Sequence, residues 1–111
     1  MADRLPPAAP GYLMGALRDR FNALAPDLAA MGTLTEMDVD ALARYVLSEN
    51  EYIRVSSLVL DAIQAEDPAT ADKWASVQDR LLRQCMAAGA EFGLTPSSRR
   101  ARGADPTEVN A

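Results

Sequence analysis

A run of 30 residues without glycine or proline, from Thr35 to Gln64, constrains this chain more than any other feature. Thr35 can cap a helix with its hydroxyl, and Asp38 three residues later gives a pattern close to a capping box. A helix of this length measures about 45 Å, whereas a compact domain of about 100 residues has a radius of gyration of about 13 Å. The helix therefore has to bend near Ser56 and Ser57, or it needs an equally long antiparallel partner.

A second helical pattern follows the turn Glu66-Asp67-Pro68 and supplies that partner. Its apolar positions recur at steps of three and four residues: Trp74, Val77, Leu81, Cys85, Ala88 and Phe92. The expected buried face of the first helix consists of Leu42, Tyr45, Val46, Tyr52, Ile53, Val59, Leu60 and Ile63. The two patterns together predict a long αα-hairpin.

The residues before this hairpin predict a shorter helix, giving an all-α fold. Leu13, Leu17, Phe21 and Leu24 share one helical face until Pro26, which we expect to interrupt the helix and open a short turn that ends at Gly32. Three prolines before residue 11 favour a flexible arm over residues 1–11. The helical domain spans residues 12–102. It ends with Gly93 as a helix stop and Thr95-Pro96 as the start of a short helix or turn, and residues 103–111 form a disordered tail.

Composition fits one domain and excludes several classes of enzyme. Of the 111 residues 49% are hydrophobic, but 21 are alanine, so a lone subunit has a thin core and self-association is expected. There is no histidine and a single cysteine, Cys85, and we find no phosphate-binding loop, which excludes a histidine-dependent triad and a cysteine zinc cluster. We expect no catalytic residues, no metal and no cofactor. No apolar stretch reaches the roughly 20 residues of a membrane span, so a cytoplasmic protein is expected.

Charge is distributed unevenly along the acidic chain, whose net charge is −5. Residues 34–72 hold nine acids and two arginines, while residues 73–102 hold two acids and six basic residues: Lys73, Arg80, Arg83, Arg99, Arg100 and Arg102. One interpretation is solvated faces with local pairs such as Asp40 with Arg44 and Asp79 with Arg83. The other is that arms of neighbouring subunits attract each other, leaving the cluster at residues 99–102 free for phosphate, with Arg4, Arg18 and Arg20 as further candidates.

Two motifs resemble those of one group of phage terminase small subunits. Residues 92–102 read FGLTPSSRRAR, similar to the closing motif of that group, and residues 32–38 read GTLTEMD, similar to its G-x-L-T-x-x-D element. Between them, Tyr45 and Tyr52 match the tyrosine that this group carries in the middle of its long helix. The resemblance covers about residues 12–102.

The resemblance implies a non-enzymatic protein that forms a ring-like homo-oligomer in the host bacterial cytoplasm. Such a protein engages double-stranded viral DNA at the packaging start site and presents it to the terminase large subunit, which carries the ATPase and nuclease activities. The arm before Tyr12 is too short for a helix-turn-helix, so we expect contacts with the DNA backbone rather than with base edges. The residues predicted to bind DNA are the six basic residues of the positive segment: Lys73, Arg80, Arg83, Arg99, Arg100 and Arg102.

Two other functions remain open from the sequence. The first is a helical adaptor that binds an acidic protein partner and touches no DNA. The second is a small enzyme using paired carboxylates such as Asp38 and Glu49, which their spacing does not favour. Trp74 fits the helix core better than a base-stacking role, and Cys85 fits an inert apolar position.

Overall fold

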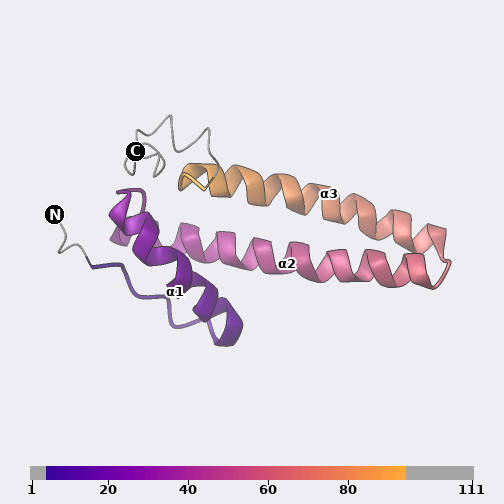
Figure 1. The fold of residues 1–111 in the computed structure, drawn as a ribbon, viewed down its shortest axis with the longest axis horizontal. Coiled ribbons are helices and arrows are strands. Elements are labelled where there is room, and N and C mark those ends of the chain that lie inside the picture. Colours follow the sequence, from indigo (N-terminus) through magenta and orange to yellow (C-terminus); the bar gives the residue numbers. More distant parts are fainter. Residues whose placement is uncertain (1–4, 95–111) are drawn as a thin grey trace, which may run out of the picture.

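The computed structural model describes residues 5–94, and over this range it contains three α-helices and no strand (Figure 1). The helices are α1 (Gly15–Ala30), α2 (Val39–Gln64) and α3 (Pro68–Glu91), with a 3-10 turn, η1 (Glu36–Asp38), before α2. Helices α2 and α3 lie side by side in opposite directions, and α1 crosses α2 near the open end of this hairpin (Figure 1). The prediction of an all-α fold with a long hairpin is confirmed.

The molecule is elongated, with extents of 55 × 33 × 20 Å and a radius of gyration of 16.6 Å. Its α2 helix has 26 residues, about 39 Å, and it continues through Ser56 and Ser57 without interruption. The Ser56 hydroxyl donates to the Tyr52 carbonyl at 2.8 Å and accepts from the Gln78 amide of α3 at 3.0 Å. The sequence left two alternatives for the long helix, a bend near Ser56 and Ser57 or an antiparallel partner. The structure shows the antiparallel partner.

The start of α2 is fixed by a capping box. The Thr35 backbone N–H donates to Asp38 Oδ2 at 3.0 Å, and Thr35 Oγ1 accepts from the Met37 N–H at 3.3 Å. The α-helix proper begins four residues later than expected, at Val39, because η1 forms the first turn. These bonds satisfy backbone donors that otherwise lack partners at a helix start.

Removing this cap should lower stability. We expect Thr35→Ala to reduce the free energy of unfolding by about 1 kcal/mol, because the Met37 N–H loses its acceptor and the Asp38 carboxylate loses the hydroxyl that donates to it. Urea denaturation followed by circular dichroism measures this change. Ser76→Ala is the matched control, since Ser76 lies exposed inside α3 and alanine is the better helix former. An equal loss in both variants would contradict a specific role for the cap.

All three helices end in the same backbone arrangement. After each helix one residue has a positive φ, namely Gly32 (78°), Glu66 (56°) and Gly93 (76°). The N–H of the residue after it donates to the carbonyl of the third-last residue of the helix, as in Leu94 N to Gly89 O at 3.0 Å. Gly32 and Gly93 are the stops expected from the sequence. Glu66 is a non-glycine residue in this conformation, at the tip of the hairpin.

The buried core surrounds the first half of α2. Residues from α1, from the loops at either end of it, from α2 and from the end of α3 form one cluster: Leu13, Phe21, Ala25, Leu28, Leu34, Leu42, Ala43, Val46 and Phe92. Among the described residues, the far half of the hairpin adds only Val55 and Ala62 to the buried apolar side chains. The core is therefore concentrated at the end of the hairpin that α1 covers.

Pro26 lies inside α1, so the prediction that it interrupts this helix is wrong. Phe21 and Ala25 before it, and Leu28 and Ala29 after it, are all buried, so both sides of the proline pack into the core. This packing holds the helix continuous although proline cannot donate a backbone hydrogen bond. Leu13 belongs to the same core but precedes the helix, which begins at Gly15.

The segment before α1 lies against the helices. Arg18 donates through Nε to the Leu13 carbonyl at 2.9 Å and through Nη2 to the Pro10 carbonyl at 3.1 Å. The Tyr12 hydroxyl donates to Asp40 Oδ1 of α2 at 2.9 Å. Residues 5–14 are thus joined to both α1 and α2, while a flexible arm over residues 1–11 stays a prediction.

Candidate functional site

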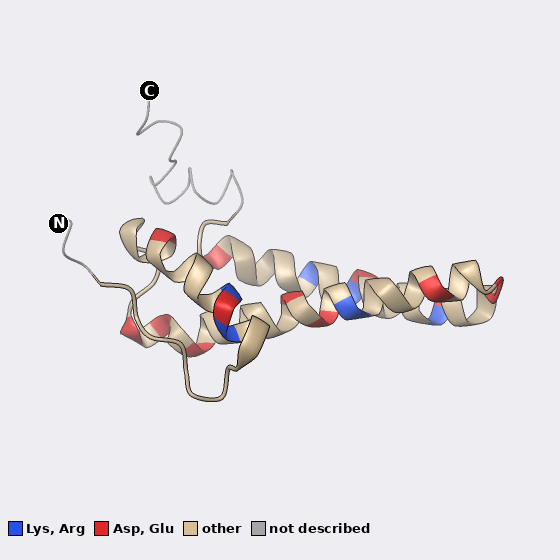
Figure 2. Ribbon diagram, turned by 60° about the horizontal axis from the view of Figure 1, so that its bottom comes forward, with Lys and Arg blue, Asp and Glu red and all other residues tan. Residues whose placement is uncertain are grey.

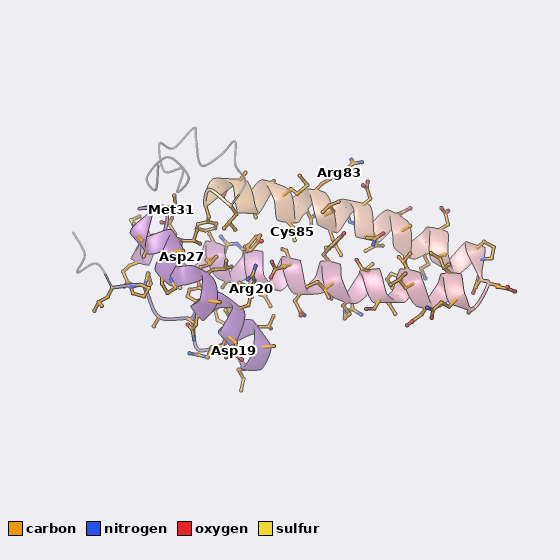
Figure 3. The ribbon with its side chains drawn as sticks, in the orientation of Figure 1. Asp19, Arg20, Asp27, Met31, Arg83 and Cys85 are labelled. Atoms are coloured by element: carbon orange, nitrogen blue, oxygen red, sulfur yellow. The ribbon has the colours of Figure 1, made fainter. Side chains whose placement is uncertain are left out.

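One face of α3 is basic and exposed. Lys73, Arg80 and Arg83 are all exposed, and their spacing of seven and three residues places them within one helical face. Figure 3 shows Arg83 projecting outward from the hairpin. Trp74, Val77 and Leu81 are half-buried, and their spacing places them on a different face of the same helix. We call the surface formed by Lys73, Arg80 and Arg83 the basic face.

The three cations of the basic face differ in their local partners. Arg83 forms an ion pair with Asp79 at 2.7 Å, which confirms that predicted pair. Lys73 Nζ lies 5.4 Å from the centroid of the Trp74 ring, within the range of a cation–π contact. Arg80 has no ion-pair partner among residues 5–94. Exposed pairs of this kind are weak, so a phosphate could replace Asp79 at Arg83 at little cost.

Most of the other arginines within residues 5–94 already form hydrogen bonds to protein groups. Arg20 makes two bonds to the Glu49 carboxylate, at 2.8 and 3.1 Å, and Arg54 makes two to Glu51, at 2.6 and 3.0 Å. Arg18 donates hydrogen bonds to the backbone carbonyls of Leu13 and Pro10. The predicted pair of Asp40 with Arg44 is not among the ion pairs of residues 5–94, since Asp40 accepts from Tyr12 instead. Arg18 and Arg20 therefore have structural roles.

The remaining predicted phosphate ligands lie outside the described residues. These are Arg99, Arg100 and Arg102, together with Arg4. The predicted short helix or turn at Thr95-Pro96 lies there as well. The structure thus places half of the six predicted DNA-binding residues, and it puts all three of those on one face.

A polar junction that the sequence did not reveal joins α1 to the hairpin. Glu49 Oε2 accepts from the Tyr45 hydroxyl at 3.1 Å while the same carboxylate binds Arg20. Burial, followed by the charge of Glu49, raises the pKa of Tyr45, so its hydroxyl remains a donor. The bond to Glu49 raises the pKa of Arg20. Asp38 is bound to Thr35, so the two carboxylates considered for catalysis are both engaged and are not brought together.

The apolar residues predicted for the core are placed unevenly. Leu42, Val46 and Phe92 are buried, whereas Tyr45, Tyr52, Trp74, Val77 and Leu81 are half-buried. Ile53, Leu60 and Ile63 are each 58% exposed. The prediction of a buried face is therefore correct for the first half of α2. In the second half, most of the large side chains of this face are exposed to solvent in the single chain.

Cys85 is half-buried, and Figure 3 places it on the side of α3 that faces α2. Burial raises the pKa of its thiol, with a smaller contribution from the charge of Glu49. A raised pKa lowers the thiolate fraction at neutral pH, which suits a packing role. Residues 5–94 contain no cluster of potential metal ligands. Within the same range, no helix is long and apolar enough to cross a membrane.

Comparison with known proteins gives one match. The model of the family described as phage terminase, small subunit, matches residues 18–108. No curated protein matches the chain, and no solved structure does. The matched region includes α2, α3 and α1 from Arg18 onward, and it continues beyond the last described residue, Leu94.

Proposed function

Because the chain belongs to the phage terminase small-subunit family, we propose that it binds double-stranded viral DNA at the packaging start site and regulates the terminase large subunit. In this role it is not itself an enzyme, and the ATPase and nuclease activities belong to the large subunit. The observation that best supports DNA binding is the basic face, where Arg80 has no ion-pair partner within residues 5–94 and Arg83 and Lys73 make only weak local contacts.

The basic face suits contact with phosphates rather than bases. Lys73 and Arg83 are ten residues apart, about 15 Å along the helix axis, so the face can follow a stretch of backbone. The positions of Arg99, Arg100 and Arg102 in the sequence add cations beyond α3. Phosphate contacts fix the position of a protein on DNA and carry no sequence information directly. Choice of the start site then depends on DNA deformability or on the large subunit.

A single subunit is a poor ligand for DNA because its net charge is −5. Linked copies act at high effective concentration and can raise affinity about 10²–10⁴-fold. We therefore propose that the protein acts as a homo-oligomer in the host bacterial cytoplasm. A ring is the form that the family resemblance implies.

A gel shift with long duplex DNA tests this proposal against a protein-binding adaptor. We expect binding at low salt that weakens steeply as salt rises, because each phosphate contact contributes about −0.9 to the slope of log K against log salt. Three to five contacts give a slope of about −3 to −4.5 for each subunit that touches the DNA, so an oligomer has a correspondingly steeper slope. Absence of a shift at low salt would favour the adaptor, and binding that does not change with salt would contradict the phosphate contacts.

A further inference from the structure

A hollow lies between α2 and α3 beside the turn that joins them. Its apolar lining consists of Val59 and Ile63 from α2 and Pro68, Ala71 and Ala75 from α3, and its volume is about 500 Å³. Ile63 is 58% exposed, so the apolar stripe of α2, the face expected to be buried, is open to solvent here. We call this feature, with the acidic residues on its rim, the tip hollow.

The rim of the tip hollow is acidic. Glu66, Asp67 and Asp72 complete its lining, all three are exposed, and within residues 5–94 no lysine or arginine lines it. Figure 2 shows acidic positions at this end of the ribbon. The Thr70 hydroxyl and backbone N–H donate to the Asp67 carboxylate at 2.7 and 3.1 Å, and they lower its pKa. In the described part of the chain, none of the three acids forms an ion pair.

The charges of the rim exclude two occupants. The phosphates of DNA are repelled by three carboxylates that have no cation beside them. A second copy of the same hollow would place these acids opposite one another, and like charges disfavour that contact as well. The tip hollow therefore suits an occupant that carries positive charge next to large apolar side chains.

The ends of this chain do not supply such an occupant. The sequence after Leu94 reads TPSSRRARGADPTEVNA, in which Val109 is the only large apolar residue and is seven positions from the last arginine. The four residues before Leu5 include Met1 and Arg4, but they span at most about 14 Å. The described chain begins near the open end of the hairpin (Figure 1), and α2 extends about 39 Å from there to the tip. The occupant is therefore expected to come from another protein.

The shape of the tip hollow suits a helix. The hollow opens between two helices that lie side by side, and an amphipathic helix that lays its apolar face into a groove is a common mode of protein recognition. Val59 and Ile63 are four residues, about 6 Å, apart along α2, which matches apolar side chains one turn apart on a partner helix. Lysines or arginines beside the apolar face of that helix can reach the carboxylates of the rim.

We propose that the tip hollow binds a basic amphipathic helix of the terminase large subunit. Its apolar side chains pack between Ile63 and Ala75, and its cations lie on Glu66, Asp67 and Asp72. The inference rests on the proposed function, which includes regulation of the large subunit, and it specifies the surface of contact. The residues of the basic face do not line the tip hollow, so the same subunit can hold DNA and the large subunit at once.

Reversing the charge of the rim tests the proposal. Surface plasmon resonance with immobilised, purified large subunit measures the affinity. We expect Glu66→Lys with Asp72→Lys to weaken binding at least tenfold, because lysines replace two of the carboxylates that attract the partner helix. Asp19→Lys with Glu36→Lys is the matched control, since it makes the same change in net charge at two exposed acids outside the hollow (Figure 3 shows Asp19). We expect the control to bind as the unchanged protein does. Unchanged affinity of the rim variant, or an equal loss in both variants, would overturn the proposal.

Shortening an apolar side chain tests the lining of the hollow without changing charge. We expect Ile63→Ala to weaken binding of the large subunit at least threefold, because the partner helix loses part of its apolar contact. Met37→Ala is the control, since Met37 is 93% exposed and lies outside the hollow. Equal affinities of these two variants would show that charge alone attracts the large subunit, which contradicts the proposed packing.

Gel shifts of the same preparations separate this inference from the proposed function. The rim variant and its control should shift DNA equally, because both replace two acids by two lysines. Binding of DNA and of the large subunit by all variants alike would overturn the inference and leave the proposed function standing. An unchanged protein that shifts DNA but does not bind the large subunit would overturn the inference and restrict the function to DNA binding. Binding to neither would overturn both.

Discussion

Replacing Phe21 by alanine should lower the free energy of unfolding by about 3–5 kcal/mol, the range for removal of a buried aromatic ring. Phe21 is completely buried. It lies in α1 and belongs to the core cluster that includes Leu42, Val46 and Phe92. Domains of this size have a total stability of about 5–15 kcal/mol, so the change takes a large share of it. Urea denaturation at a fixed protein concentration measures the loss, since association also contributes to stability.

Met14→Ala is the control for this prediction. Met14 lies directly before α1 and is 74% exposed, so we expect a change within about 0.5 kcal/mol. A loss below about 1 kcal/mol for Phe21→Ala would contradict the packing of α1 on α2, because even a modest cavity in this core costs more.

The second large effect concerns DNA. Changing Arg99, Arg100 and Arg102 together to alanine should reduce the magnitude of the salt slope by about three for each subunit that touches the DNA, since each phosphate contact contributes about one. Affinity should fall at low salt while the mass of the protein is unchanged. Gel shifts over a series of salt concentrations, with light scattering on the same samples, measure both quantities.

Arg54→Ala is the matched control because it removes an exposed arginine that is already paired with Glu51. We expect its salt slope to equal that of the unchanged protein. Normal binding by the triple variant would place the main contact elsewhere, and Arg80 on the basic face is then the first residue to change. Loss of binding together with loss of mass would indicate a role of these arginines in assembly.

The overall architecture could be predicted because its determinants are local. The absence of glycine and proline between Thr35 and Gln64, the cap formed by Thr35 and Asp38, and the stops at Gly32 and Gly93 all act within a few residues. Packing between segments that are far apart in the sequence does not follow from such local patterns. The sequence does not show that α1 continues through Pro26, because this helix is held by contacts of Phe21 and Leu28 with other elements.

The candidate site was predictable in part for the same reason. The basic face follows from the spacing of residues in one helix, and so does the pair of Asp79 with Arg83. The junction of Arg20 with Glu49 joins residues 29 positions apart, and no sequence signal indicates that these two residues contact each other. Periodicity identified the apolar stripe of α2, but it could not show that α1 covers the first half alone.

The uneven core has a mechanical consequence. The end of the hairpin that α1 covers holds almost all of the fully enclosed side chains, whereas the far end relies on Val55 and Ala62. Local opening costs least where few apolar contacts must be broken. The far end of the hairpin is therefore expected to open more readily than the end that α1 covers. A partner that binds along the far end also stabilises its helices, so that binding and local ordering are coupled.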